Sequence, residues 1–113
     1  MSSKVLNVGE DDFDRIVLHC QTPVLVHFWA DWCSPSNMIA SALEELGYLY
    51  QPHLLIAKVN IDHNRQLSGR YHVFSVPFLI VFNHGQIQAI RPGVVCMGEM
   101  RSIVQRTLAA VAA

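Results

Sequence analysis

Hydrophobic residues along the chain follow two periodicities, which divide it into short strands and amphipathic helices. Near-continuous apolar runs such as VLVHFWA (24–30) are typical of strands that are buried on both faces. Over 34–50 the apolar residues instead recur at steps of three and four, which predicts a helix with one buried face. The predicted strands are 4–7, 24–30, 54–60, 78–82 and 86–90, and the predicted helices are 10–20, 34–50, 62–70 and 97–111.

This order of elements, β-α-β-α-β-α-β-β-α, predicts an α/β fold with a central mixed sheet of about five strands flanked by four helices. The whole chain, 1–113, is expected to form a single domain. The stretch Asn83-His84-Gly85 joins the last two strands as a hairpin, with Gly at the position that needs an unusual φ. The central strands are expected to be parallel, and reactive groups in such a sheet gather where a strand ends and a helix begins. Cys33 lies at such a position.

Composition and charge narrow the classes of function. The 113 residues are 51% hydrophobic with a net charge of −1 and no run of Lys or Arg, so we expect no nucleic acid or anionic membrane as partner. The apolar runs are too short for a membrane span, and the first residues lack the apolar core of a signal peptide. Three cysteines without scaffold spacing favour a reducing compartment, the cytoplasm. The histidines lack ligand spacing, so no metal is expected.

The stretch FWADWCSPSNM (28–38) carries the candidate chemistry. Cys33 follows an apolar strand and opens a helix, where unpaired backbone N–H groups and the helix dipole stabilise a thiolate. Pro35 suits the first helical turn because it has no N–H group to lose. Ser36 lies three residues after Cys33, at the same end of the helix. Its hydroxyl is expected to donate a hydrogen bond to the sulfur, but it cannot form a disulfide.

Several motifs share one family pattern: FWADWCSPS (28–36) against F-W-A-x-W-C-G-P-C, MIA (38–40), AKVNID (57–62), SVP (75–77), FNHGQ (82–86) and Gly93. On these motifs the chain closely resembles the thioredoxin family. The resemblance implies the thioredoxin fold, with Pro77 in the cis form beside Cys33. It also implies that Val76 pairs with the backbone of an extended substrate and that Trp32 forms a wall of the groove.

Departures from the family pattern bear on the expected function. Ser36 removes the second thiol, which would expel a substrate from the mixed disulfide. His27 replaces the family's buried acid, while Lys58 matches the lysine that pairs with that acid. Phe78 replaces a Thr and is expected to add apolar bulk to the groove. Ser41 stands where the family has a helix-kinking proline.

These features predict a monothiol thiol–disulfide exchange protein, of the oxidoreductase or isomerase class if it is active. Cys33 is expected to form mixed disulfides with protein or glutathione disulfides, and an external thiol such as glutathione would release them; no other cofactor is expected. The predicted groove residues are Trp32, Val76, Pro77, Phe78 and Gly93. Two alternatives stay open: a redox-inactive binding or chaperone-like module, and a dithiol protein with an engineered Cys-to-Ser change at 36. A monomer or weak dimer is expected.

Overall fold

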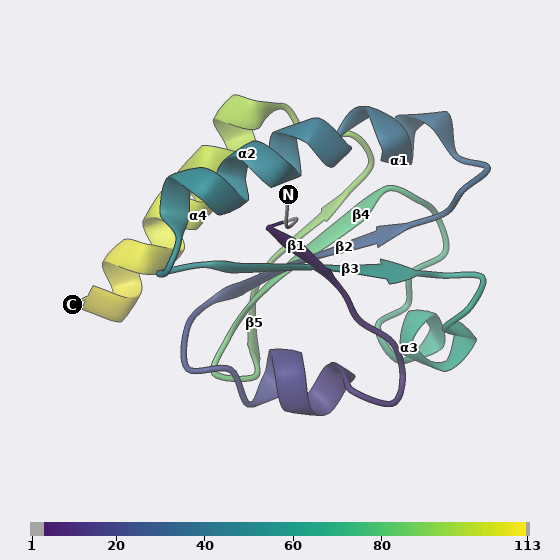
Figure 1. Ribbon diagram of the computed structural model, residues 1–113, viewed down its shortest axis with the longest axis horizontal. Coiled ribbons are helices and arrows are strands. Elements are labelled where there is room, and N and C mark those ends of the chain that lie inside the picture. Colours follow the sequence, from purple (N-terminus) through teal and green to yellow (C-terminus); the bar gives the residue numbers. More distant parts are fainter. Residues whose placement is uncertain (1–3, 113) are drawn as a thin grey trace.

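The computed structural model describes residues 4–112, and five strands in that range form one mixed sheet (Figure 1). The strands are β1 (Val5–Asn7), β2 (Val24–Trp29), β3 (Leu55–Asn60), β4 (Phe78–Asn83) and β5 (Gln86–Pro92), in the spatial order β1-β3-β2-β4-β5. β1, β3 and β2 are parallel, whereas β4 is antiparallel to both β2 and β5. The predicted fold class, parallel central strands with a hairpin at one side, is confirmed.

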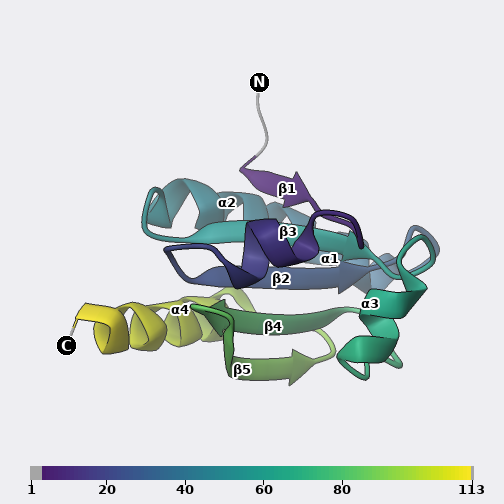
Figure 2. The same ribbon diagram turned by 90° about the horizontal axis from the view of Figure 1, so that it is seen from below.

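Helices cover both faces of this sheet. They are η1 (Asp14–Leu18), a short π-helix, followed by α1 (Ser34–Met38), α2 (Ala40–Tyr50), α3 (Arg65–Arg70) and α4 (Met97–Ala112). In Figures 1 and 2, α2 and α4 lie on one face, and η1 and α3 lie on the other. In the part of the chain that is described, no helix combines the length and the apolar character that crossing a membrane requires.

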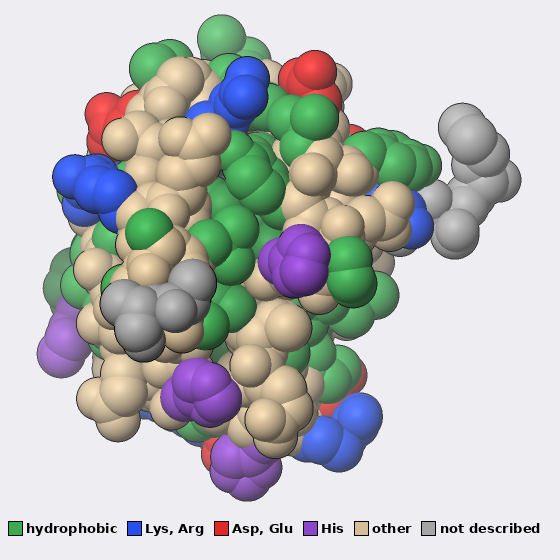
Figure 3. All heavy atoms as spheres, turned by 90° about the vertical axis from the view of Figure 1, so that its left-hand side faces the viewer, with side chains coloured by type: hydrophobic (Ala, Val, Ile, Leu, Met, Phe, Trp, Pro, Cys, Tyr) green, Lys and Arg blue, Asp and Glu red, His purple; other side chains and the backbone are tan. Residues whose placement is uncertain are grey.

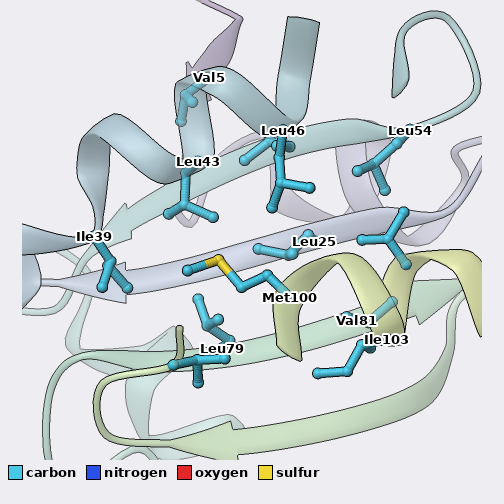
Figure 4. Packing of buried hydrophobic residues seen from close by; sticks show 13 residues of the cluster. Val5, Leu25, Ile39, Leu43, Leu46, Leu54, Leu79, Val81, Met100 and Ile103 are labelled. Carbon is cyan, nitrogen blue, oxygen red and sulfur yellow. The ribbon is translucent and has the colours of Figure 1, made fainter. Parts of the chain in front are cut away.

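The face under α2 and α4 is closed by aliphatic side chains. Leu43 and Leu46 point down from α2 towards the sheet, where they share one cluster with Met100 of α4 and the sheet residues Leu25 and Leu79 (Figure 4). All five are 2% exposed or less. Each such side chain contributes about 1.5–3 kcal/mol relative to an exposed one, so this packing holds α2, and α1 before it, against the sheet.

The opposite face is closed by aromatic rings, and here one prediction is wrong. Phe78 was expected to add apolar bulk to the substrate groove, but it is only 9% exposed. Its ring meets Phe28 edge to face, with the centroids 6.2 Å apart. Alternate residues of a strand share a face, so Phe78 lies with Ile80 and Phe82 in the core cluster beneath η1 and α3.

The predicted helix over 34–50 is two helices, because the chain leaves helical geometry at Ile39. Its φ and ψ are −92° and −3°, and its N–H group pairs with the carbonyl of Asn37. The Ile39 side chain is 4% exposed and packs in the same cluster as Leu43. No proline is needed for this break, since Ser41 lies within the first turn of α2.

Two further predictions need correction near turns. The helix expected over 10–20 is the shorter η1, which is closed by a bond from the His19 N–H group to the Asp14 carbonyl. The hairpin turn was expected to need one residue of positive φ, Gly85, but His84 also adopts it, at φ 51°. A pair of positive φ values suits the right-handed twist of the two flanking strands.

The carboxyl end of β2 points away from the end of the molecule that carries the C-terminus (Figure 1). Figure 3 looks at that C-terminal end and shows a narrow band of hydrophobic side chains between polar ones, with His side chains towards its lower edge. The chemistry predicted for Cys33 therefore belongs to the other end of the molecule, where β2 leads into α1.

Candidate active site

Cys33 occupies the N-cap of α1, four residues after the end of β2. Its φ and ψ of −98° and 103° are extended, so the helix begins at the next residue. The Cys33 N–H group donates to the Ala30 carbonyl at 3.1 Å, and its own carbonyl accepts from Asn37 N–H at 3.3 Å. Pro35 lies in the first turn. Cys33 thus lies at the end of α1 where backbone N–H groups lack partners within the helix, although its side chain makes no capping hydrogen bond to them.

Three segments that are distant in sequence meet at this cysteine. The Cys33 thiol donates to the carbonyl oxygen of Val76 at 3.4 Å. The Val76–Pro77 peptide bond is cis, and the Pro77 carbonyl accepts a hydrogen bond from the Gly93 N–H group at 2.8 Å. Val76 and Gly93 are half-buried and Pro77 is buried. The structure therefore brings together four of the predicted residues, and Trp32 adjoins them in sequence.

The sulfur lies low within a rim of exposed apolar side chains. Cys33 is only 6% exposed. Large hydrophobic side chains from the segments around it are exposed: Trp32 67%, Met38 70%, Phe74 86% and Val94 55%. We call these four residues the apolar rim.

Trp32 is exposed but held in place. Its indole Nε1–H donates to Oδ2 of Asp62 at 2.8 Å. The N–H group of Asp62 in turn donates to the side-chain oxygen of Asn60, the last residue of β3, at 2.9 Å. A fixed indole loses little conformational entropy when a partner covers it, so Trp32 is suited to form a wall of a binding groove.

Ser36 does not make the hydrogen bond that the sequence suggested. It is 1% exposed, and its Oγ has no hydrogen-bond partner among residues 4–112. The thiol of Cys33 is directed to Val76 instead. The first turn of α1 thus turns Ser36 into the protein while the sulfur faces the segment before β4, and the hydroxyl makes no hydrogen bond to the sulfur.

His27 and Lys58 are neighbours in register on β2 and β3. His27 is 3% exposed, and burial first, then the charge of Lys58, lower its pKa to about 4, so the imidazole is neutral at pH 7. Its Nε2 has no partner within the described chain. It lines a cavity of about 190 Å³ together with Lys58, Ser41 and Glu44. The ammonium group of Lys58 lies 5.0 Å from the centre of the Trp29 ring.

The other two cysteines lie outside this arrangement. Cys20 is half-buried and its sulfur is 3.4 Å from the Thr22 hydroxyl, whereas Cys96 is exposed just before α4. All three cysteines are free thiols. Across residues 4–112, no three His, Cys, Asp or Glu side chains gather as they would around a metal ion.

Phe74, like Met38 and Val94, is a residue of the apolar rim that sequence reasoning missed. In YHVFSVP (71–77) it follows Val73 and precedes Ser75, so the pattern alone does not separate a core residue from an exposed one. Val73 is in fact buried at 6% exposure, and Phe74 turns outward. The sequence signal that could have indicated this exposed residue is an aromatic side chain two positions before the Val76-Pro77 pair.

Comparison with known proteins identifies relatives over nearly the whole chain. The sequence model of the Thioredoxin family matches residues 4–106. Thioredoxin of Acidithiobacillus ferridurans is 37% identical over 108 residues, which is 96% of this chain and 100% of that protein. Thioredoxin of Pseudomonas aeruginosa is 34% identical and thioredoxin C-2 of Corynebacterium nephridii is 32% identical, each with the same coverage.

Proposed function

The chain belongs to the thioredoxin family of thiol–disulfide redox proteins, and on this premise we propose that it works with one thiol, Cys33. Two observations together support the proposal. Cys33 lies at the N-cap of α1 beside Val76 and Pro77, and the residue three positions later is a serine and not a second cysteine. The sulfur of Cys33 is the proposed nucleophile in this arrangement. Because Ser36 is not a cysteine, the motif has no second thiol that could break a mixed disulfide between Cys33 and a substrate.

The reaction is an exchange of one disulfide for another. The Cys33 thiolate attacks one sulfur of a protein disulfide, a new bond to Cys33 forms, and the original sulfur–sulfur bond breaks. The second substrate sulfur leaves as a thiolate with the electron pair. Because Ser36 cannot repeat this attack on the mixed disulfide, the substrate stays bound to Cys33 until another thiol arrives.

Release is proposed to come from a small external thiol such as glutathione or from a further thiol of the substrate. Attack by glutathione on the Cys33 sulfur frees the substrate thiol and leaves Cys33 in a disulfide with glutathione, which a second glutathione breaks with release of oxidised glutathione. Attack by a further substrate thiol on the substrate sulfur frees Cys33 and shuffles the disulfide. Three free cysteines support a reducing compartment, and we propose the cytoplasm. This chemistry suits disulfide shuffling or removal of glutathione from proteins better than net reduction.

The test is the stoichiometry of the reaction with a protein disulfide such as insulin. Without added thiol, the protein should be consumed as a mixed disulfide and then stop. With glutathione, exchange should become catalytic, whereas thioredoxin reductase with NADPH should not sustain it. A Cys33→Ser variant serves as the blank. Catalytic turnover with the reductase alone would contradict the monothiol proposal.

A second candidate is a redox-inactive binding module, and the burial of the sulfur favours it. Cys33 is 6% exposed while the apolar rim around it is open. Such a module would hold extended peptides through the rim and Val76 without forming a covalent bond. The two candidates differ in one result: peptide binding by the module would survive Cys33→Ser, whereas capture by the exchange protein would be lost.

A further inference from the structure

Phe74 is the most exposed large hydrophobic residue in the described chain, and we propose that it determines which disulfides Cys33 attacks. The favoured substrates are protein segments in which an apolar, above all an aromatic, side chain lies near the reacting cysteine. This inference rests on the proposed function, because it assigns a preference to the same thiol.

The position of Phe74 places it beside the incoming substrate. It precedes Val76 by two residues, so the two Cα atoms are at most about 7 Å apart. The carbonyl of Val76 in turn is 3.4 Å from the Cys33 sulfur. The Phe74 ring lies 6.1 Å from the ring of His72, at 51°, which supports one of its sides and leaves the rest to solvent.

The two phenylalanines of this segment have opposite surroundings. Phe78 is 9% exposed and packs on Phe28, so it serves the core. Phe74 is 86% exposed, so packing in the core does not explain why an aromatic residue stands at this position. An exposed aromatic ring gains free energy when a partner's apolar side chain covers it. Phe74 would gain this free energy when a bound substrate covers its ring.

Charge also favours an apolar partner. The segment 71–77 contains no Asp, Glu, Lys or Arg, so it offers a charged substrate segment no counter-charge. Trp32, Met38 and Val94 extend the apolar surface around the sulfur. Because Cys33 is itself only 6% exposed, we infer that a substrate disulfide contacts the apolar rim before it reaches the thiol. A small hydrophilic disulfide lacks the side chains that would hold it there.

Two activated peptides test this preference. Each carries one cysteine in a disulfide with thionitrobenzoate; one has Phe two residues to either side of the cysteine, and the other has Ser. When Cys33 attacks the peptide sulfur, the sulfur–sulfur bond breaks, thionitrobenzoate leaves with the electron pair and can be followed by its absorbance, and the thiol proton goes to solvent. The same reaction on Cys33→Ser measures the contribution of the other cysteines, and it is subtracted.

The variants are Phe74→Ser, Phe74→Leu as the conservative change, and Leu49→Ser as the matched control. Leu49 is 52% exposed and lies near the end of α2 that is far from α1 (Figure 1). Phe74→Ser should slow exchange with the Phe peptide about tenfold and leave the Ser peptide within about twofold. Phe74→Leu should retain most of the preference, and Leu49→Ser should change neither rate.

The outcomes separate this inference from the proposed function. An equal fall for both peptides, or no fall for either, would overturn the role of Phe74 while exchange at Cys33 still stands. If the unmodified protein reacts with neither peptide above the Cys33→Ser blank, the monothiol function fails and the preference fails with it.

Discussion

The sulfur of Cys33 lies 3.4 Å from the carbonyl oxygen of Val76, a residue 43 positions further along the chain. This contact joins the N-cap of α1 to the segment before β4. It directs the thiol to a backbone group that, in the resemblance to the family, pairs with an extended substrate. The reactive atom and the proposed docking edge are therefore one structural unit.

Ser36→Cys should convert lasting capture of the substrate as a mixed disulfide into its release. A thiol at this position can attack the mixed disulfide at Cys33, releasing the substrate and closing a disulfide within the motif. The lifetime of the mixed disulfide, followed by mass spectrometry, should fall sharply in Ser36→Cys and stay long in Ser36→Ala. Equal lifetimes in the two variants would mean that the surroundings, His27 included, no longer support the dithiol reaction.

Phe78→Ala and Phe74→Ala should differ in stability although the two residues are neighbours. Removing the buried ring of Phe78 should lower the free energy of unfolding by about 3 kcal/mol, because it leaves a cavity against Phe28. Removing the exposed ring of Phe74 should change it by less than about 0.5 kcal/mol. Denaturant unfolding measures both, and a large loss for Phe74→Ala would show that this ring packs in the fold.

His27 should make the protein less stable as the pH falls. Its pKa is 6.5 when unfolded but about 4 in the folded protein, where burial and then Lys58 oppose protonation. Between pH 6.5 and pH 4 the unfolded chain binds more protons at this residue than the folded protein does. The free energy of unfolding therefore falls as the pH falls from 6.5 towards 4. The loss reaches about 3 kcal/mol. Glu44 and Lys58 are the other ionisable groups at the same cavity.

The check is denaturant unfolding between pH 7 and pH 4 in His27→Leu, with His19→Gln as the control for an exposed histidine. In His27→Leu the free energy of unfolding should lose much less between pH 7 and pH 4 than in the unmodified protein, since the variant lacks the group that titrates. His19→Gln should leave the dependence as it is. An unchanged slope in His27→Leu would assign the acid sensitivity to the carboxylates instead.

Asp62→Ala should free the indole of Trp32. The bond from Trp32 Nε1 to Asp62 is the contact that holds this exposed ring, and a hydrogen bond to a charged group contributes about 1.5–3 kcal/mol. In a Trp29→Phe background, where Trp32 alone emits, fluorescence anisotropy should fall in Asp62→Ala. Asp31→Ala, which removes the carboxylate beside Trp32 in sequence, should leave the anisotropy unchanged.

The fold could be predicted largely from the sequence, because strand and helix periodicities here are strong. The runs 24–30 and 78–82 are nearly all apolar, and the parallel order follows from the alternation of strands and helices. The break at Ile39 could not be predicted, since no proline stands there and the apolar periodicity continues through it. Similarly, periodicity does not separate the π-helix η1 from an α-helix.

The site was predicted in its residues more than in its contacts. Cys33, Val76, Pro77 and Gly93 do meet, as the motifs implied. Phe78 turns inward because it lies on the buried face of β4, whereas Phe74 turns outward from the irregular segment before that strand, and sequence spacing does not fix either orientation. The donor role expected of Ser36 failed for the same kind of reason, because its rotamer and burial are set by packing.

The most direct measurement is the identity of the cysteine that captures a peptide disulfide. The intact protein is mixed with an apolar peptide disulfide without added thiol, digested, and mapped by mass spectrometry. The account predicts one peptide per chain on Cys33, released by glutathione and absent in Cys33→Ser. Cys96 is the exposed competitor. Modification of Cys96 with Cys33 left as a free thiol would contradict it.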